Sequence, residues 1–124
     1  MKLIRSVDHV SFAVRNLERS LEFYCNVLGL EKAPRPDLGF PGAWLTVGDS
    51  QIHLLEVPAG FDGGTPPPDL NPIASHAALG IDDHAAVRDV LRKHGLPVFE
   101  LEASGQMWVK DPDGHIIELI SSVR

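Results

Sequence analysis

Two stretches share one strand pattern and indicate the architecture of the chain: Val7-Asp8-His9-Val10-Ser11-Phe12-Ala13-Val14 and Ala74-Ser75-His76-Ala77-Ala78-Leu79-Gly80-Ile81. Their histidines coincide at an offset of 67 residues. In the first stretch larger apolar side chains alternate with small or polar ones, as in a strand with one buried face. Similarity at a fixed offset indicates an internal repeat.

The segments that follow the two strands also correspond. Residues 16–28 carry apolar side chains at helical spacing, and residues 83–94 form the equivalent segment. Both segments end at a glycine followed by a leucine, Gly29-Leu30 and Gly95-Leu96, which suits a left-handed helix cap. Asn16 is the expected N-cap of the first helix, and Asp82 or Asp83 that of the second.

Three short strands are expected after each helix. They cover residues 31–35, 42–47 and 51–57 in the first copy and residues 97–101, 107–110 and 115–121 in the second. Each copy is therefore a β-α-β-β-β module, and the fold class is α+β. One domain, residues 1–124, contains a first module of about 1–58, a Gly- and Pro-rich linker 59–72, and a second module of about 73–124.

Composition narrows the classes of function. A chain of 124 residues with 44% hydrophobic and 23% charged residues fits one globular domain. The net charge of −6 argues against a nucleic-acid surface. No apolar run approaches a membrane span, and no secretory signal is expected at the start. The single cysteine, Cys25, forms no intrachain disulfide, and a cytoplasmic protein is the expectation.

Potential metal ligands occupy equivalent strands of the two copies. His9 and His53 lie 44 residues apart, in the first and last strands of the first copy, and His76 and Glu118 lie 42 residues apart in the second. If each copy curls its sheet into half a barrel, all four side chains point into one trough. Three imidazoles and a carboxylate suit Zn²⁺, Ni²⁺, Fe²⁺, Co²⁺ or Mn²⁺.

A structural interpretation competes with this one. An isolated histidine in a strand is more often a hydrogen-bonded structural residue, and a ferredoxin-like duplication could bury histidines for packing. The other polar residues near the candidates are expected not to be ligands: His84 and His94 on an exposed helix face, His115, Asp8 and Glu56 facing away from their neighbouring ligand candidates.

Four further residues share strand parity with the trough face, namely Trp44, Thr46, Gln106 and Trp108. The two tryptophans are either core residues or the walls of an apolar substrate pocket. Phe40 and Phe61 lie near Gly- and Pro-rich stretches and could close over such a pocket.

The chain resembles the vicinal oxygen chelate superfamily, which includes glyoxalase I, fosfomycin-resistance thiol transferases, extradiol dioxygenases and bleomycin-binding proteins. The resemblance covers nearly the whole chain and is carried by residues 8–14, Leu21-Glu22-Phe23-Tyr24, Val27-Leu28-Gly29-Leu30 and residues 111–118. It implies paired modules of the glyoxalase-like fold, a homodimer, and a divalent metal held by His9, His53, His76 and Glu118. It also implies that the metal chelates two neighbouring oxygens of a small substrate, with Glu118 as ligand or base.

Departures from the glyoxalase I pattern occur at two positions. Ala13 stands where an arginine usually binds the glutathione carboxylate, and Val57 where a polar residue is usual. Ser11 matches the hydroxyl residue of the fosfomycin transferases. We therefore expect a metal-dependent enzyme of lyase, isomerase or thiol-transferase type with Glu118 and Ser11 as catalytic residues. The alternative is a non-catalytic drug- or metabolite-binding protein. The substrate, the metal, and whether one chain or a dimer completes the site stay open.

Overall fold

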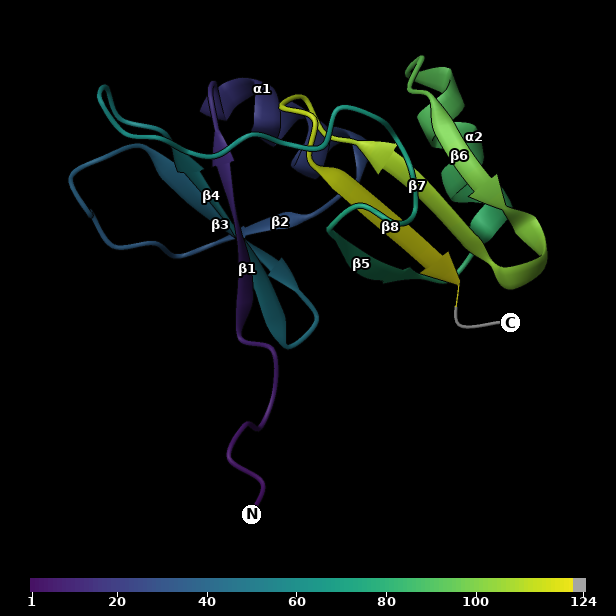
Figure 1. Cartoon of the computed structure of the whole chain (residues 1–124), viewed down its shortest axis with the longest axis horizontal. Helices are drawn as coiled ribbons and strands as arrows, with labels where there is room; N and C mark the ends of the chain where they lie inside the picture. The colour runs from purple at the N-terminus through teal and green to yellow at the C-terminus, as the bar shows by residue number, and fades with distance from the viewer. Residues whose placement is uncertain (122–124) are drawn as a thin grey trace. The chain divides into compact units, whose positions relative to one another are not determined.

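The computed structural model describes residues 1–121, and the chain divides into two compact units. Unit 1 is Met1–Gly64, and unit 2 begins at Thr65. Each unit is a four-stranded mixed sheet accompanied by a helical segment (Figure 1). The predicted α+β class with duplicated modules is confirmed.

Both units follow the same order of elements. Unit 1 contains β1 (His9–Val14), α1 (Leu17–Leu21), η1 (Glu22–Val27), β2 (Glu31–Ala33), β3 (Gly42–Val47) and β4 (Ser50–Glu56). Unit 2 contains β5 (His76–Ile81), α2 (His84–Lys93), β6 (Val98–Leu101), η2 (Glu102–Ser104), β7 (Gln106–Lys110) and β8 (Ile116–Ser121). The strand orders are β1-β4-β3-β2 and β5-β8-β7-β6, and in each sheet only the first pair is parallel.

The predicted helix caps are present. The Asn16 side chain accepts a hydrogen bond from the Arg19 amide, and Asp83, rather than Asp82, accepts from the Ala86 amide. Gly29 and Gly95 adopt φ values of 79° and 72°, which favour glycine because they lie in the left-handed region. Helix α2 closes with bonds from the Leu96 and Gly95 amides to the carbonyls of Leu91 and Arg92, a Schellman motif.

The first helix differs from the second because it contains one more residue. Thirteen positions separate Asn16 from Gly29, and twelve separate Asp83 from Gly95. The extra residue is accommodated by the wide turns of the π-helix η1, where the Leu28 amide donates to the Phe23 carbonyl. The capping bond from the Leu30 amide to the Tyr24 carbonyl likewise spans one residue more than the bond from Leu96 to Leu91 in α2.

Several strand ends differ from the prediction. Strand β2 stops at Ala33 because Pro34 has no amide to donate, and β6 starts after Pro97. The 3₁₀ turn η2 is an element that the sequence pattern did not indicate.

One face of each sheet packs apolar side chains with the helical segment of its own unit. The buried residues of unit 1 include Val14, Phe23, Tyr24, Ala43, Leu45, Ile52 and Leu54, and those of unit 2 include Leu91, Met107, Val109, Ile117 and Leu119. We call the opposite face the site face. By strand alternation it carries His9, Ser11, Ala13, Gln51, His53, Leu55, Gly42, Trp44 and Thr46 in unit 1, and His76, Ala78, Gly80, Ile116, Glu118, Ile120, Gln106, Trp108 and Lys110 in unit 2.

The predicted linker, residues 59–72, contributes to both units. In unit 1 a Cβ placed on Gly63 would lie 2.8 Å from Val57 and 3.0 Å from Ala13, so this segment packs directly on the end of β1. In unit 2 the Lys110 Nζ donates to the Pro68 carbonyl at 2.7 Å. The boundary between the units falls at Gly64, inside the predicted linker.

Within residues 1–121 no helix combines the length and the apolar character needed to cross a lipid bilayer.

Candidate functional site

The strand registers place the predicted site residues at equivalent points of the two sheets. Ser11, His53 and Trp44 are cross-strand neighbours in unit 1, and Ala78, Glu118 and Trp108 are their counterparts in unit 2. One step along the sheet, His9 pairs with Gln51 and His76 with Ile116. His9 therefore corresponds to His76, and His53 corresponds to Glu118.

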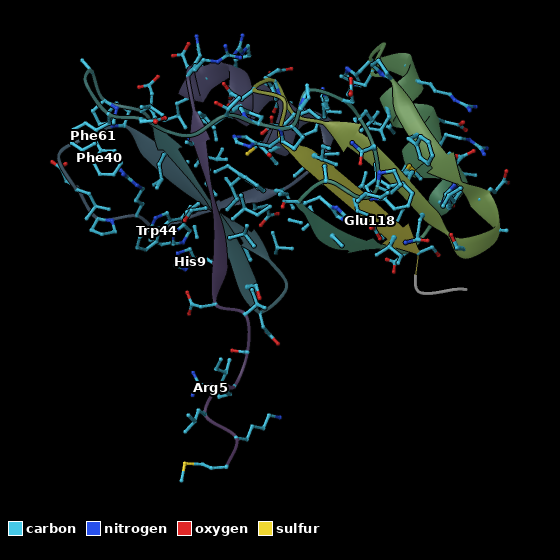
Figure 2. All side chains as sticks on the ribbon, in the orientation of Figure 1. Arg5, His9, Phe40, Trp44, Phe61 and Glu118 are labelled. Carbon is cyan, nitrogen blue, oxygen red and sulfur yellow. The ribbon has the colours of Figure 1, made fainter. Side chains whose placement is uncertain are left out.

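In unit 2 the structure brings two of the predicted ligands together. His76 Nε2 lies 3.0 Å from Glu118 Oε1, and Glu118 is buried, with 6% of its surface exposed. Figure 2 labels Glu118. The His76 Nδ1 lies 2.6 Å from the carbonyl oxygen of Ala74. A carbonyl can only accept, so Nδ1 carries a proton and donates it to Ala74, while Nε2 faces the carboxylate. Nε2 is thus the ring atom that contacts Glu118 and the one a metal ion would bind.

The residues around this pair hold it in place. Gln106 Nε2 donates to Glu118 Oε2 at 3.2 Å, and Ser104 Oγ donates to Gln106 Oε1 at 2.6 Å. Trp108 is 2% exposed and meets the His76 ring edge-on at a centroid distance of 6.3 Å. Gln106 and Trp108, the expected pocket residues of this module, thus contact the His76–Glu118 pair.

In unit 1 the aromatic rings of the site face form a stack. His9 and His53 have ring centroids 3.8 Å apart, and Trp44 stacks on His53 at 4.5 Å. Figure 2 labels His9 and Trp44. The His9 Nδ1 lies 2.7 Å from Asp8 Oδ1, and the His53 Nε2 lies 2.8 Å from Gln51 Oε1. Side-chain alternation predicted that Asp8 faces away from His9, yet its carboxylate contacts the His9 ring.

Burial and the neighbouring His9 lower the pKa of His53 below its ordinary value. The hydrogen bond to His9 lowers the pKa of the Asp8 carboxyl. A neutral imidazole is the form that binds metals. However, parallel stacked rings direct their lone pairs side by side, and Gln51 engages the His53 Nε2. His53 has to rotate before it can join His9 as a ligand.

Across residues 1–121, no group of three or more His, Cys, Asp or Glu side chains is gathered for a metal ion. The structure instead shows two pairs, His9 with His53 and His76 with Glu118. Convergence of all four residues therefore stays a prediction. Ser11 and Thr46 are exposed on the site face of unit 1, and Phe61 is 72% exposed.

Three polar residues that were expected not to be ligands are His84, His94 and Glu56. The exposed position expected for His84 is wrong: its side chain is 14% exposed, and its Nε2 lies 3.0 Å from Glu100 on β6, because the first turn of α2 packs on that strand. His94 is exposed as expected. Glu56 is paired, since its carboxylate accepts a hydrogen bond from the Leu17 amide at the start of α1.

Arg35 is a charged residue of this region that the sequence pattern did not single out. It follows β2, and its NH2 group donates to the Phe40 carbonyl at 3.1 Å. A Cβ on Gly42 would lie 2.8 Å from that nitrogen, so the guanidinium rests on the site face of unit 1. The sequence did contain one indication. Arg35 lies two residues beyond Ala33, the register partner of Trp44, so by alternation its side chain belongs on the same face as Trp44.

Comparison with known proteins places the chain in a family. The model of the Glyoxalase/Bleomycin resistance protein/Dioxygenase superfamily matches residues 6–119. The chain is 36% identical over 125 residues to the lactoylglutathione lyase of Neisseria meningitidis serogroup A, covering 90% of this chain and 87% of that protein. It is 32% identical over 123 residues to the Arabidopsis thaliana protein "Glyoxylase I 4", covering 94% and 70% respectively.

A solved structure agrees with these relatives. The trypanothione-dependent glyoxalase I of Leishmania major superimposes with a TM-score of 0.71 at 27% identity, covering 95% of this chain and 87% of that one. The duplicated β-α-β-β-β units and the family match lead to the same conclusion: the chain belongs to the Glyoxalase/Bleomycin resistance protein/Dioxygenase superfamily.

Proposed function

We propose that the protein is a metal-dependent enzyme of the glyoxalase type, a lyase or isomerase that acts on a small oxygen-bearing substrate. The observation that carries the proposal is the matching environment of His9 and His76. In both rings Nδ1 meets an acceptor, the Asp8 carboxylate at 2.7 Å and the Ala74 carbonyl at 2.6 Å. Histidines that ligate metals hold their second nitrogen in this way, which directs the other nitrogen at the ion.

The donor set of unit 2 fits a divalent metal. Adjacent ligand atoms in an octahedral site with bonds of about 2.1 Å lie about 3.0 Å apart. The His76 Nε2 and Glu118 Oε1 are separated by 3.0 Å. We propose His9, His76 and Glu118 as ligands, with His53 as a fourth after it leaves Gln51. The nitrogen and oxygen donors suit Zn²⁺, Ni²⁺, Mn²⁺, Fe²⁺ or Co²⁺.

The chain's own groups supply the remaining chemistry. A divalent metal, when bound, supplies Lewis acidity toward two neighbouring oxygens of the substrate. The Glu118 carboxylate is buried and has Oε2 fixed by Gln106, so it is placed to accept and return a proton. Ser11 is exposed beside His53 on the site face, where its hydroxyl can contact a substrate oxygen. Trp44, Thr46, Gln106 and Trp108 are the proposed walls of the substrate pocket.

The first test measures metal content and stability. Protein purified without chelator should contain about one divalent ion per chain, and chelator treatment should lower its melting temperature because a ligand bound to the native state stabilises it. His76→Ala should contain little metal and should not respond to added Ni²⁺, Zn²⁺ or Mn²⁺. His94→Ala, an exposed histidine on the helix end, is the matched control. A metal-free wild type whose melting is unchanged by all of these ions would contradict the proposal.

The second test measures turnover. The hemithioacetal of methylglyoxal and glutathione is the first substrate to assay, since related lyases carry lactoylglutathione in their names. We expect the metal-loaded wild type to isomerise this substrate. If Glu118→Gln still binds metal but has lost the isomerisation, the result supports Glu118 as the base. Saturable binding of small molecules without any conversion indicates the non-catalytic binding protein instead. A homodimer, also expected, is measured by light scattering on the same samples.

A further inference from the structure

Arg35 is a cation of the site face that lacks an anionic partner. Among residues 1–121 no carboxylate lies within ion-pair distance of its guanidinium, and its buried Nε has no hydrogen-bond partner. Its NH2 group donates one hydrogen bond, to the Phe40 carbonyl. A partly buried guanidinium with an unsatisfied N–H costs stability unless another group satisfies it. A carboxylate from outside the chain would supply the missing acceptor.

The guanidinium is held in a fixed position. The Phe40 ring lies under its Cζ at 5.1 Å, a cation–π contact, while the Phe40 carbonyl binds NH2. On its other side the guanidinium packs on Gly42, where a Cβ would come within 2.7 Å of the Leu54 carbonyl oxygen and 2.8 Å of NH2. A rigid, preorganised fork is the group that proteins use to bind a planar carboxylate.

The surroundings of Arg35 connect it to the candidate site. Ala13, Leu55 and Gly42 form one row across the sheet, and the next row contains Ser11, His53 and Trp44. The first of these rows has no polar side chain, and Gly63 packs over its Ala13 end. The positive charge of Arg35 is also among the causes that lower the pKa of His53, after burial and His9. Arg35 is therefore the charged group at this end of the site face.

We infer that Arg35 binds a carboxylate of the substrate and so makes the proposed enzyme specific for carboxylate-bearing molecules. This inference rests on the proposed function and adds the substrate class to it. The carboxylate could belong to a short hydroxy or oxo acid, or to the glutathione part of a thiol adduct. Both sources present the same planar group to the guanidinium, and the experiment separates them.

The test compares a carboxylate with its neutral amide. Lactate, lactamide and S-methylglutathione are titrated into the full-length protein as purified, and again after chelator dialysis, while the Trp44 indole N–H signal is followed by NMR. We expect a carboxylate probe to bind the wild type more tightly than lactamide, and Arg35→Gln to weaken that binding about 10- to 100-fold. Arg35→Lys should retain part of the preference, because it keeps the charge and loses the fork.

Controls separate this inference from the proposed function. Arg92→Gln, an exposed arginine on α2, should bind every probe like the wild type. Arg35→Gln should fold with unchanged or raised stability, since it removes an unsatisfied buried N–H. Preference for lactate identifies a short acid, and preference for S-methylglutathione identifies the thiol adduct. If folded Arg35→Gln keeps the full preference in the metal-free protein, the inference is wrong, whatever the metal and turnover assays show.

Discussion

The carboxylate of Glu118 is shared between two side chains that differ in what they provide. His76 Nε2 lies 3.0 Å from Oε1, and Gln106 donates to Oε2 at 3.2 Å. The amide therefore fixes the orientation of the carboxylate without neutralising it. Ser104 holds the opposite end of the same amide, so the orientation of Glu118 is set by a chain of hydrogen bonds that starts at η2.

Gln106→Ala should weaken metal binding about 10-fold or more, because removal of a group that orients a ligand carboxylate lets the carboxylate rotate. Competition with a metal-sensitive dye measures the affinity. Asn26→Ala, which removes an exposed amide on η1, is the matched control and should bind metal normally. Unchanged affinity in Gln106→Ala would show that Glu118 does not depend on this bond.

Cys25 gives a pH-dependent prediction away from the proposed ligands. Burial raises the pKa of its thiol above the ordinary value, and the nearby charge of Lys32 opposes this only in part. Iodoacetamide should therefore alkylate the native protein more slowly than the denatured protein at pH 8, because less thiolate is present. Cys25 is the chain's single cysteine, so mass spectrometry reports its reaction without ambiguity.

The sign for stability follows from the same shift. As the pH rises through the ordinary thiol pKa, the unfolded chain loses its proton before the native one does. The native state then binds more protons, and the free energy of unfolding falls with rising pH. Cys25→Ala should lose this part of the pH dependence, and an alkylation rate equal in both states would contradict the raised pKa.

The linker packs on the end of β1 because residue 63 has no side chain. A Cβ there would meet Val57 at 2.8 Å and Ala13 at 3.0 Å. The two positions where the sequence departs from the glyoxalase I pattern are thus the two that the linker covers. A large polar side chain at residue 13 or 57 would have to displace Gly63. The small side chains at these two positions therefore allow the linker to pack on β1.

Gly63→Ala should lower the free energy of unfolding by about 1–3 kcal/mol, the usual cost of overpacking. In a Val57→Ala background the same substitution should cost less, since the nearest contact is gone. Gly80→Ala is the control because a Cβ there meets nothing within 4 Å. Urea unfolding of the wild type, the two single variants, the double variant and the control measures these free energies. An equal cost of Gly63→Ala in both backgrounds would mean that the contact with Val57 is not responsible.

Elements were the easiest part to predict from the sequence. Alternation in β1 and β5, the caps Asn16 and Asp83, and the glycines at 29 and 95 each have a local physical cause, so they appear in a single sequence. The wide turns of η1 were not predicted, because one extra residue can be accommodated in several ways. The pairing of Glu118 with His76 followed from the repeat, whereas the roles of Asp8, Gln106 and Arg35 depend on rotamers that parity does not determine.

The duplication provides two pairs of side chains at equivalent positions, with different chemistry. The pair of unit 1 has two imidazoles, one of them with its nitrogen engaged by Gln51. The pair of unit 2 has an imidazole and a buried carboxylate 3.0 Å apart. If the four residues serve one ion, each pair alone should bind it weakly, because affinity grows with the number of ligands held in place.

This proposal predicts non-additive loss of stabilisation by metal. At a free metal concentration of 100 times Kd, one bound ion should stabilise the wild type by about 2.7 kcal/mol. His9→Ala and His76→Ala should each remove most of this increment, and the double variant should remove no more than either one, since both contribute to a single binding event. The measurement is the difference in unfolding free energy with and without metal, with His94→Ala as the control. Two separate increments, each lost with one histidine, would mean that the two pairs bind independent ions.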